Sequence, residues 1–127
     1  MKPYKTNIEQ ETIDNEFYRK VLFTANKLQL VVMNLKVGED IPEEVHHNID
    51  QFIRIETGTA FVRIDGQEFN LKDDEIIIIP AASKHYVKNS GDRELKLYSI
   101  YATPEHPDGT IHKTKAEADA YEEEHQH

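Results

Sequence analysis

The chain has 127 residues, a formal net charge of −9 and no cysteine. This length suits one domain, the acidic charge argues against nucleic acid and anionic lipid as partners, and the lack of cysteine excludes disulfides and thiolate metal sites. The N-terminus has no apolar segment of the signal-peptide type, and no apolar run is long enough to span a bilayer, so we expect a cytoplasmic protein without a membrane partner.

The chain from about Phe17 to Ala102 reads as a series of short strands separated by turn residues. Leu28 to Val37 is rich in branched apolar residues, and Gly38-Glu39-Asp40 ends it. Gln51 to Glu56 alternates, which places Gln51, Ile53 and Ile55 on one face of a strand. This pattern predicts an all-β fold, a sandwich or a barrel.

The next expected element is a hairpin. Ala60 to Ile64 alternates up to Asp65-Gly66, a dipeptide that favours a type I′ turn because both central residues need positive φ. Ile76 to Ile79 is wholly apolar and β-branched, and we expect it to be a strand buried on both faces. Tyr86 to Lys88 and Leu95 to Tyr101 should form the last strands, with Tyr98 and Tyr101 on opposite faces so that one of them reaches the interior.

The C-terminal stretch differs in character. His106 to Gly109 reads as a turn, and Thr114 followed by Glu117 forms a capping box that predicts a short helix up to Glu124. The apolar face of this helix is thin, so we expect it outside the barrel or frayed. His106 and His112 could cover the barrel mouth, although a surface loop is the default expectation.

Four polar residues are candidates for a metal site. Glu44 and His46 are two apart and point to the same face of a strand, and His85 lies far along the chain. His46 and Gln51 can share a face only if the chain turns between them, where His47 to Asp50 are turn-prone. Inward-pointing Gln51 needs a partner, and either a metal or a buried hydrogen bond would serve. His47 should be solvated.

These residues stand in two motifs that resemble those of the cupin family. The first family motif is Gly-x5-His-x-His-x4-Glu-x6-Gly, and this chain has Gly38-x5-Glu44-x-His46-x4-Gln51-x6-Gly58. The second is Gly-x5-Pro-x-Gly-x2-His-x3-Asn, and this chain has Asp74-x5-Pro80-x-Ala82-x2-His85-x3-Asn89. Every spacing is kept. The departures are Glu44 for His, Gln51 for Glu, and Asp74 and Ala82 for glycines.

The resemblance implies a single cupin domain over residues 1–127. Its barrel core would be a double-stranded β-helix, or jelly roll, over about residues 17–102, and residues 103–127 would form an extension with the short helix. By motif position, Glu44, His46, Gln51 and His85 would hold one divalent metal ion. Two histidines and one carboxylate suit iron and tolerate manganese, nickel or zinc, with Gln51 as a weak fourth ligand or a residue that orients water.

Relatives of this kind also suggest partners and function. Small cupins generally form homodimers through edge strands, and the segment up to Phe23 could be a swapped or edge strand. We expect a small-molecule ligand in the barrel. The chain would then be a metal-dependent enzyme of oxygenase, isomerase or lyase type. The alternatives are a non-catalytic module that binds a small ligand and a structural cupin without metal, because fold does not fix function.

Overall fold

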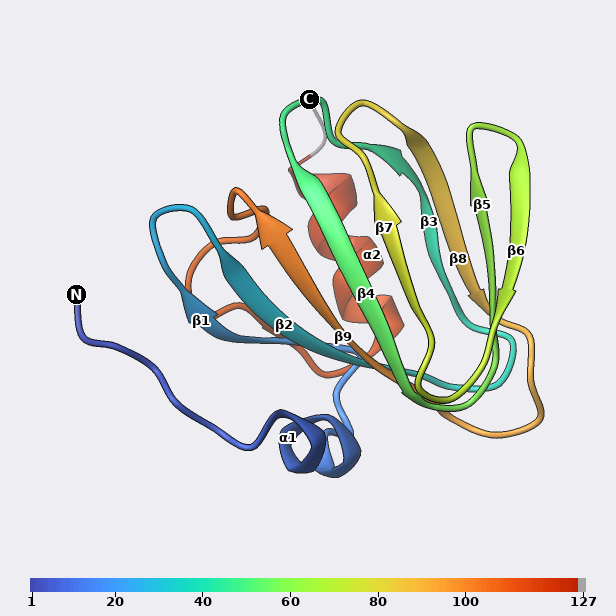
Figure 1. Cartoon of the computed structure of the whole chain (residues 1–127), viewed down its shortest axis with the longest axis horizontal. Helices are drawn as coiled ribbons and strands as arrows, with labels where there is room; N and C mark the ends of the chain where they lie inside the picture. The colour runs from blue at the N-terminus through green and yellow to red at the C-terminus, as the bar shows by residue number, and fades with distance from the viewer. Residues whose placement is uncertain (126–127) are drawn as a thin grey trace.

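Two antiparallel β-sheets face each other in the computed structural model, which describes residues 1–125 (Figure 1). The larger sheet has the strand order β10–β1–β2–β9–β4–β7, with bounds β1 (Arg19–Thr24), β2 (Gln29–Leu35), β4 (Asp50–Thr57), β7 (Ile76–Ile79), β9 (Leu95–Ala102) and β10 (Ile111–His112). The smaller sheet has the order β3–β8–β5–β6, with bounds β3 (Asp40–Val45), β5 (Ala60–Ile64), β6 (Gln67–Leu71) and β8 (Lys84–Asn89). Residues 126 and 127, the end of the expected extension, lie outside the described residues.

The two sheets enclose one hydrophobic core. Ile53 and Ile55 of β4 and Val62 of β5 are fully buried in it, and Ile64 is partly buried against it. Their side chains meet because alternate residues of a strand point to the same face. With the C-terminal helix described below, this arrangement confirms the expected all-β double-stranded β-helix.

Several turns need backbone conformations that L-residues rarely adopt. Asp65 and Gly66 both have positive φ, 48° and 82°, as the type I′ hairpin between β5 and β6 requires. Asp74 and Ala82 also have positive φ, 70° and 69°. These are the two positions where the cupin motif has glycine, so the motif glycines correspond to turns that need a left-handed residue.

Strand β7 corrects one expectation. Ile77 and Ile79 are buried, but Ile76 and Ile78 are 45% and 59% exposed, so the strand is buried on one face only. The physical reason is that only the inner face of β7 packs on the core, while alternate residues point to the outer face, which is exposed. On this face Ile78 pairs with Phe52, which pairs in turn with Ile100.

The N-terminal segment contains a helix that was not expected. Helix α1 (Ile8–Asp14) is capped by the Asn7 side chain, which accepts a hydrogen bond from the Gln10 amide, and it packs against β2, β4 and β9. Strand β1 follows and lies second from the edge, because β10 pairs with Arg19 and Lys20.

The C-terminal helix lies closer to the core than expected. Helix α2 (Lys115–Glu124) begins at Thr114, whose side chain caps the Glu117 amide as the capping box predicts. It lies outside the two sheets, as expected, but packs against them, because Ala118 is small enough to be buried in the core cluster. Lys115 also pairs with Asp40 of β3 at 3.4 Å. Helix α2 therefore lies beside β10 of the larger sheet and reaches β3 of the smaller one. No helix among residues 1–125 has the length and apolar character to cross a membrane.

Candidate metal centre

Glu44, His46 and His85 come together at one end of the barrel. Glu44 Oε1 lies 3.1 Å from His46 Nε2 and 3.6 Å from His85 Nε2. One potential ligand atom from each of the three residues lies within 4.8 Å of the others. This separation suits donor atoms that share one ion, because each ligand bond is about 2 Å long.

The strand register explains why residues distant in the sequence meet. Strands β3 and β8 are antiparallel, and Glu44 pairs directly with His85. The register of β3 shifts between Ile41 and Glu44, and irregularities of this kind re-aim side chains near functional sites. His46 lies just beyond the end of β3 and accepts a hydrogen bond from the Ala82 amide at its carbonyl. The smaller sheet and its adjoining turn thus supply all three side chains.

Hydrogen bonds hold both imidazoles with Nε2 toward Glu44. His85 Nδ1–H donates to the Ser83 carbonyl at 3.0 Å, and His46 Nδ1–H donates to the Glu105 carboxylate at 2.8 Å. A carbonyl can only accept, so the proton of neutral His85 is on Nδ1 and its Nε2 carries the lone pair. Partners of this kind are typical behind metal-binding histidines, where they fix the tautomer and the ring orientation.

Two buried atoms of the candidate centre make no regular hydrogen bond among the described residues. They are His85 Nε2 and His46 Nε2, and the latter has only the Glu44 carboxylate beside it, at 3.1 Å. The buried Oε1 of Gln51 also has no hydrogen-bond partner there. Gln51 reaches the interior from β4 of the opposite sheet, and its Nε2 donates to Ser99 Oγ at 3.3 Å. Leaving buried polar atoms unpaired is unfavourable, and a divalent cation at the Glu44, His46 and His85 cluster would bind both imidazole nitrogens. The donor set of two imidazoles and one carboxylate fits such an ion.

The electrostatics of the cluster also favour a bound cation. Burial raises the pKa of Glu44, but the two imidazoles outweigh this effect and hold the pKa well below its usual range. Burial lowers the pKa of His46, but the carboxylates of Glu105 and Glu44 outweigh it and raise the pKa to about 10. The surroundings of His46 therefore stabilise positive charge, which a proton or a metal ion can supply.

The structure adds residues around the candidate centre that the sequence did not indicate. Glu105 follows β9 and has no motif position. Its backbone and that of His106 are held by Gln29 of β2, which accepts from both amides at 3.0 Å and 2.9 Å and donates to the His106 carbonyl at 2.7 Å. Gln29 is 77 residues away from His106 in sequence, and no local pattern could have paired them.

Two expectations about aromatic and histidine side chains now have outcomes. Tyr101 is 2% exposed and lies with its ring centre 6.2 Å from that of His46, whereas Tyr98 is on the outer face. His106 packs edge-on against Tyr101 at 5.3 Å, and His112 is buried. The surface-loop expectation for His106 and His112 was therefore wrong, because Gln29 and the pairing of β10 with β1 hold this segment against the barrel. His47 is exposed, as expected.

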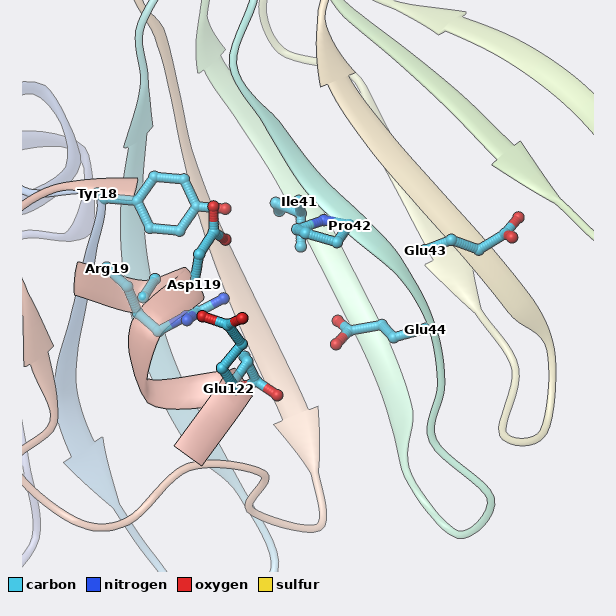
Figure 2. Close-up of a pocket in the computed structure, with 10 residues that line it drawn as sticks. Tyr18, Arg19, Ile41, Pro42, Glu43, Glu44, Asp119 and Glu122 are labelled. Atoms are coloured by element: carbon cyan, nitrogen blue, oxygen red, sulfur yellow. The ribbon is translucent and has the colours of Figure 1, made fainter. Parts of the chain in front are cut away.

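A cavity of about 350 Å³ adjoins the candidate metal centre. Glu44 forms part of its wall, together with β1, β3 and helix α2 (Figure 2). Pockets that hold small ligands usually have volumes of about 300–1,000 Å³. A small molecule in this cavity would therefore lie beside the Glu44 carboxylate.

Comparison with known proteins agrees with this architecture. The Cupin domain family profile matches residues 31–101. The uncharacterized protein YrkC of Bacillus subtilis (strain 168) is 46% identical over 128 residues, which cover 96% of this chain and 69% of YrkC. The uncharacterized protein L612 of Acanthamoeba polyphaga mimivirus is 42% identical over 113 residues, which cover 85% of this chain and 70% of L612. The crystal structure of BH2720 from Bacillus halodurans has a TM-score of 0.92 and 46% identity, and covers 94% of this chain and 95% of that one.

Proposed function

The chain belongs to the cupin family, and from this premise we propose that it is a metal-dependent enzyme acting on a small molecule held in its barrel. Glu44, His46 and His85 would bind one divalent ion, with Gln51 as a weaker fourth ligand. The observation that carries the proposal is the convergence of one ligand atom each from Glu44, His46 and His85 within 4.8 Å, with His85 Nε2 buried and without a hydrogen-bond partner among the described residues.

The donor set limits the ion and its chemistry. Two imidazoles and a carboxylate suit iron, manganese, nickel or zinc. The bound ion would supply Lewis acidity or, as iron, reactivity with dioxygen, which covers oxygenase, isomerase and lyase reactions. The cavity wall is the side from which a small molecule would approach.

The chain's own residues would prepare the site. Ser83 and Glu105 orient the two imidazoles. Tyr101 is buried against His46, and its burial raises the pKa of its phenol, so the hydroxyl stays protonated and can donate a hydrogen bond near the site. Its ring and that of His106 exclude water from the side of the site opposite the smaller sheet.

A non-catalytic ligand-binding cupin without metal is the second candidate, and one observation favours it. His46 Nε2 lies 3.1 Å from Glu44 and His46 Nδ1 lies 2.8 Å from Glu105. A protonated His46 between two carboxylates makes a self-sufficient ion triplet that needs no metal. The two candidates therefore differ in what neutralises Glu44.

Metal content separates the two candidates. Protein produced without a histidine tag should contain close to one equivalent of a transition metal by elemental analysis, or take it up from iron, manganese, nickel or zinc salts. His46→Ala and His85→Ala should each lose most of it, because each removes one of two imidazole donors. His47→Ala is the matched control, since His47 is adjacent but exposed, and it should retain the metal. Equal metal in all four proteins, or none in the wild type after loading, would reject the metal-dependent function.

A further inference from the structure

A buried arginine without an acidic partner among the described residues lines the cavity beside the candidate metal centre. Arg19 of β1 is only 5% exposed. Among the described residues its guanidinium makes one side-chain hydrogen bond, from Nη1 to His112 Nδ1 at 3.2 Å, while its Nε is buried without a partner. No carboxylate of residues 1–125 forms an ion pair with it, although eight of the other ion pairs involve lysine or arginine.

Such an arrangement is unfavourable unless something supplies the missing negative charge. An arginine stays protonated at any physiological pH, and a buried charge without a counter-charge is strongly unfavourable. The Tyr18 ring, 5.4 Å from the guanidinium carbon, offsets only part of this cost. His112 cannot supply the charge, because an imidazole is either neutral or positive and here only accepts a hydrogen bond from Arg19 at Nδ1.

Arg19 is directed into a space that a ligand can enter. It lines the cavity of about 350 Å³ together with Glu44. In Figure 2 the Arg19 and Glu44 side chains point toward one another from opposite sides of this cavity. Tyr18, Ile41 and Pro42 supply apolar wall between them. The Arg19 guanidinium on one wall and Glu44, the one residue of the candidate metal centre that lines the cavity, on the other bound a site for a small molecule.

The charges around the opening limit what can bind. Asp119, Glu122 and Glu123 of α2 line the same cavity. Asp119 is neutralised by Lys115 at 2.6 Å, but neither Glu122 nor Glu123 forms an ion pair within the described chain. These carboxylates would repel phosphates and dicarboxylates, while a single carboxylate could still pair with Arg19 at the inner wall.

We propose that Arg19 binds the carboxylate of a small monocarboxylic acid whose remaining part is neutral or positively charged. A guanidinium presents two parallel N–H donors that match the two oxygens of a carboxylate. The proposal deepens the proposed function, because it rests on the same cavity and names the substrate class that would reach the metal centre. The contact with Arg19 itself does not require the metal.

Ligand binding to the wild-type protein gives the first test. Short-chain monocarboxylates such as propionate and β-alanine should raise the melting temperature at millimolar concentrations, since a ligand that binds only the folded state stabilises it. The matching amides, succinate and inorganic phosphate should raise it less or not at all. If no monocarboxylate binds, or if the amides bind equally well, the proposal is overturned.

Variants then assign the contact. Arg19→Gln should weaken carboxylate binding at least tenfold in calorimetry, and Arg19→Lys should retain part of it because the charge remains without the fork. Arg93→Gln is the matched control, since Arg93 is exposed and pairs with Asp73. Unchanged carboxylate binding in Arg19→Gln would also overturn the proposal. If this variant does not fold, the comparison of acids with amides on the wild type and the Arg19→Lys result still decide.

The experiment is run with metal-loaded and with metal-free protein, so the two proposals fail separately. Arg19→Gln should keep its metal, because Arg19 is not in the proposed ligand set. Metal without carboxylate binding would overturn the role of Arg19 and leave the metal centre intact. If the wild type takes up no metal but binds carboxylates through Arg19, the metal centre would be overturned and the role of Arg19 would stand.

Discussion

The turn positions shared with the cupin motifs allow us to predict which substitutions lower the free energy of unfolding and which one raises it. Gly38 and Gly58 have positive φ, 82° and 108°, and so does Ala82 at 69°. A side chain in this region costs roughly 1–2 kcal/mol, and the greater freedom of glycine in the unfolded chain offsets about 0.4–1 kcal/mol of that. Gly38→Ala should therefore lower the free energy of unfolding slightly, by about 0.5–1 kcal/mol, because a Cβ there would meet no atom within 4 Å.

Gly58 adds a steric term. A Cβ at this position would lie 2.8 Å from the Glu94 carbonyl oxygen and 2.9 Å from Leu95 Cα. Both are backbone atoms of the neighbouring segment and cannot rotate away, so overpacking adds roughly 1–3 kcal/mol to the strain. Gly58→Ala should cost about 1.5–4 kcal/mol in total.

Ala82→Gly should have the opposite sign. Ala82 is exposed, so removing its methyl group sacrifices no packing, and the variant should gain about 0.5–1 kcal/mol. Chemical denaturation followed by circular dichroism in the presence of a chelator would measure all three variants on the same metal-free basis. At this size 1 kcal/mol corresponds to about 3–5 °C in melting temperature. The reasoning is refuted if Gly38→Ala is as damaging as Gly58→Ala, or if Ala82→Gly is less stable than the wild type.

Three further predictions concern the site and the outer face. Gln51→Glu should lower the melting temperature of the metal-free protein, because it adds a buried carboxylate. Manganese or zinc should then raise the melting temperature of this variant more than that of the wild type. An equal rise in both proteins would show that Gln51 does not lie near the metal. Ile79→Ala should lower the free energy of unfolding by about 2–4 kcal/mol and Ile78→Ala by less than about 1 kcal/mol, because only Ile79 is buried. Similar losses in chemical denaturation of the two variants would contradict the one-sided burial of β7. The homodimer expected through edge strands is tested by Ile78→Lys, which should shift the mass measured by light scattering to that of a monomer, and an unchanged dimer would place the contact elsewhere.

Local sequence determined much of the fold and part of the site. Alternation through Gln51, Ile53 and Ile55 identified the inward face of β4, and Asp65-Gly66 identified the hairpin, because both signals depend only on neighbouring residues. The motif spacing brought Glu44, His46 and His85 into one hypothesis. The Asn7 cap with Gln10 three residues later could have indicated α1, but the helix is too short and too polar to show a periodic pattern.

The tertiary structure decided what depends on the covering of sheet faces and on distant partners. Four consecutive isoleucines look the same whether one face or both faces of a strand are covered, so only the tertiary structure shows that Ile76 and Ile78 are exposed. Arg19 and His112 are 93 residues apart and meet because β10 pairs with β1. Sequence alone determined which residue types face inward along each strand, whereas the closing of the two sheets determined which of them share a cavity, because contacts between distant segments leave no local pattern.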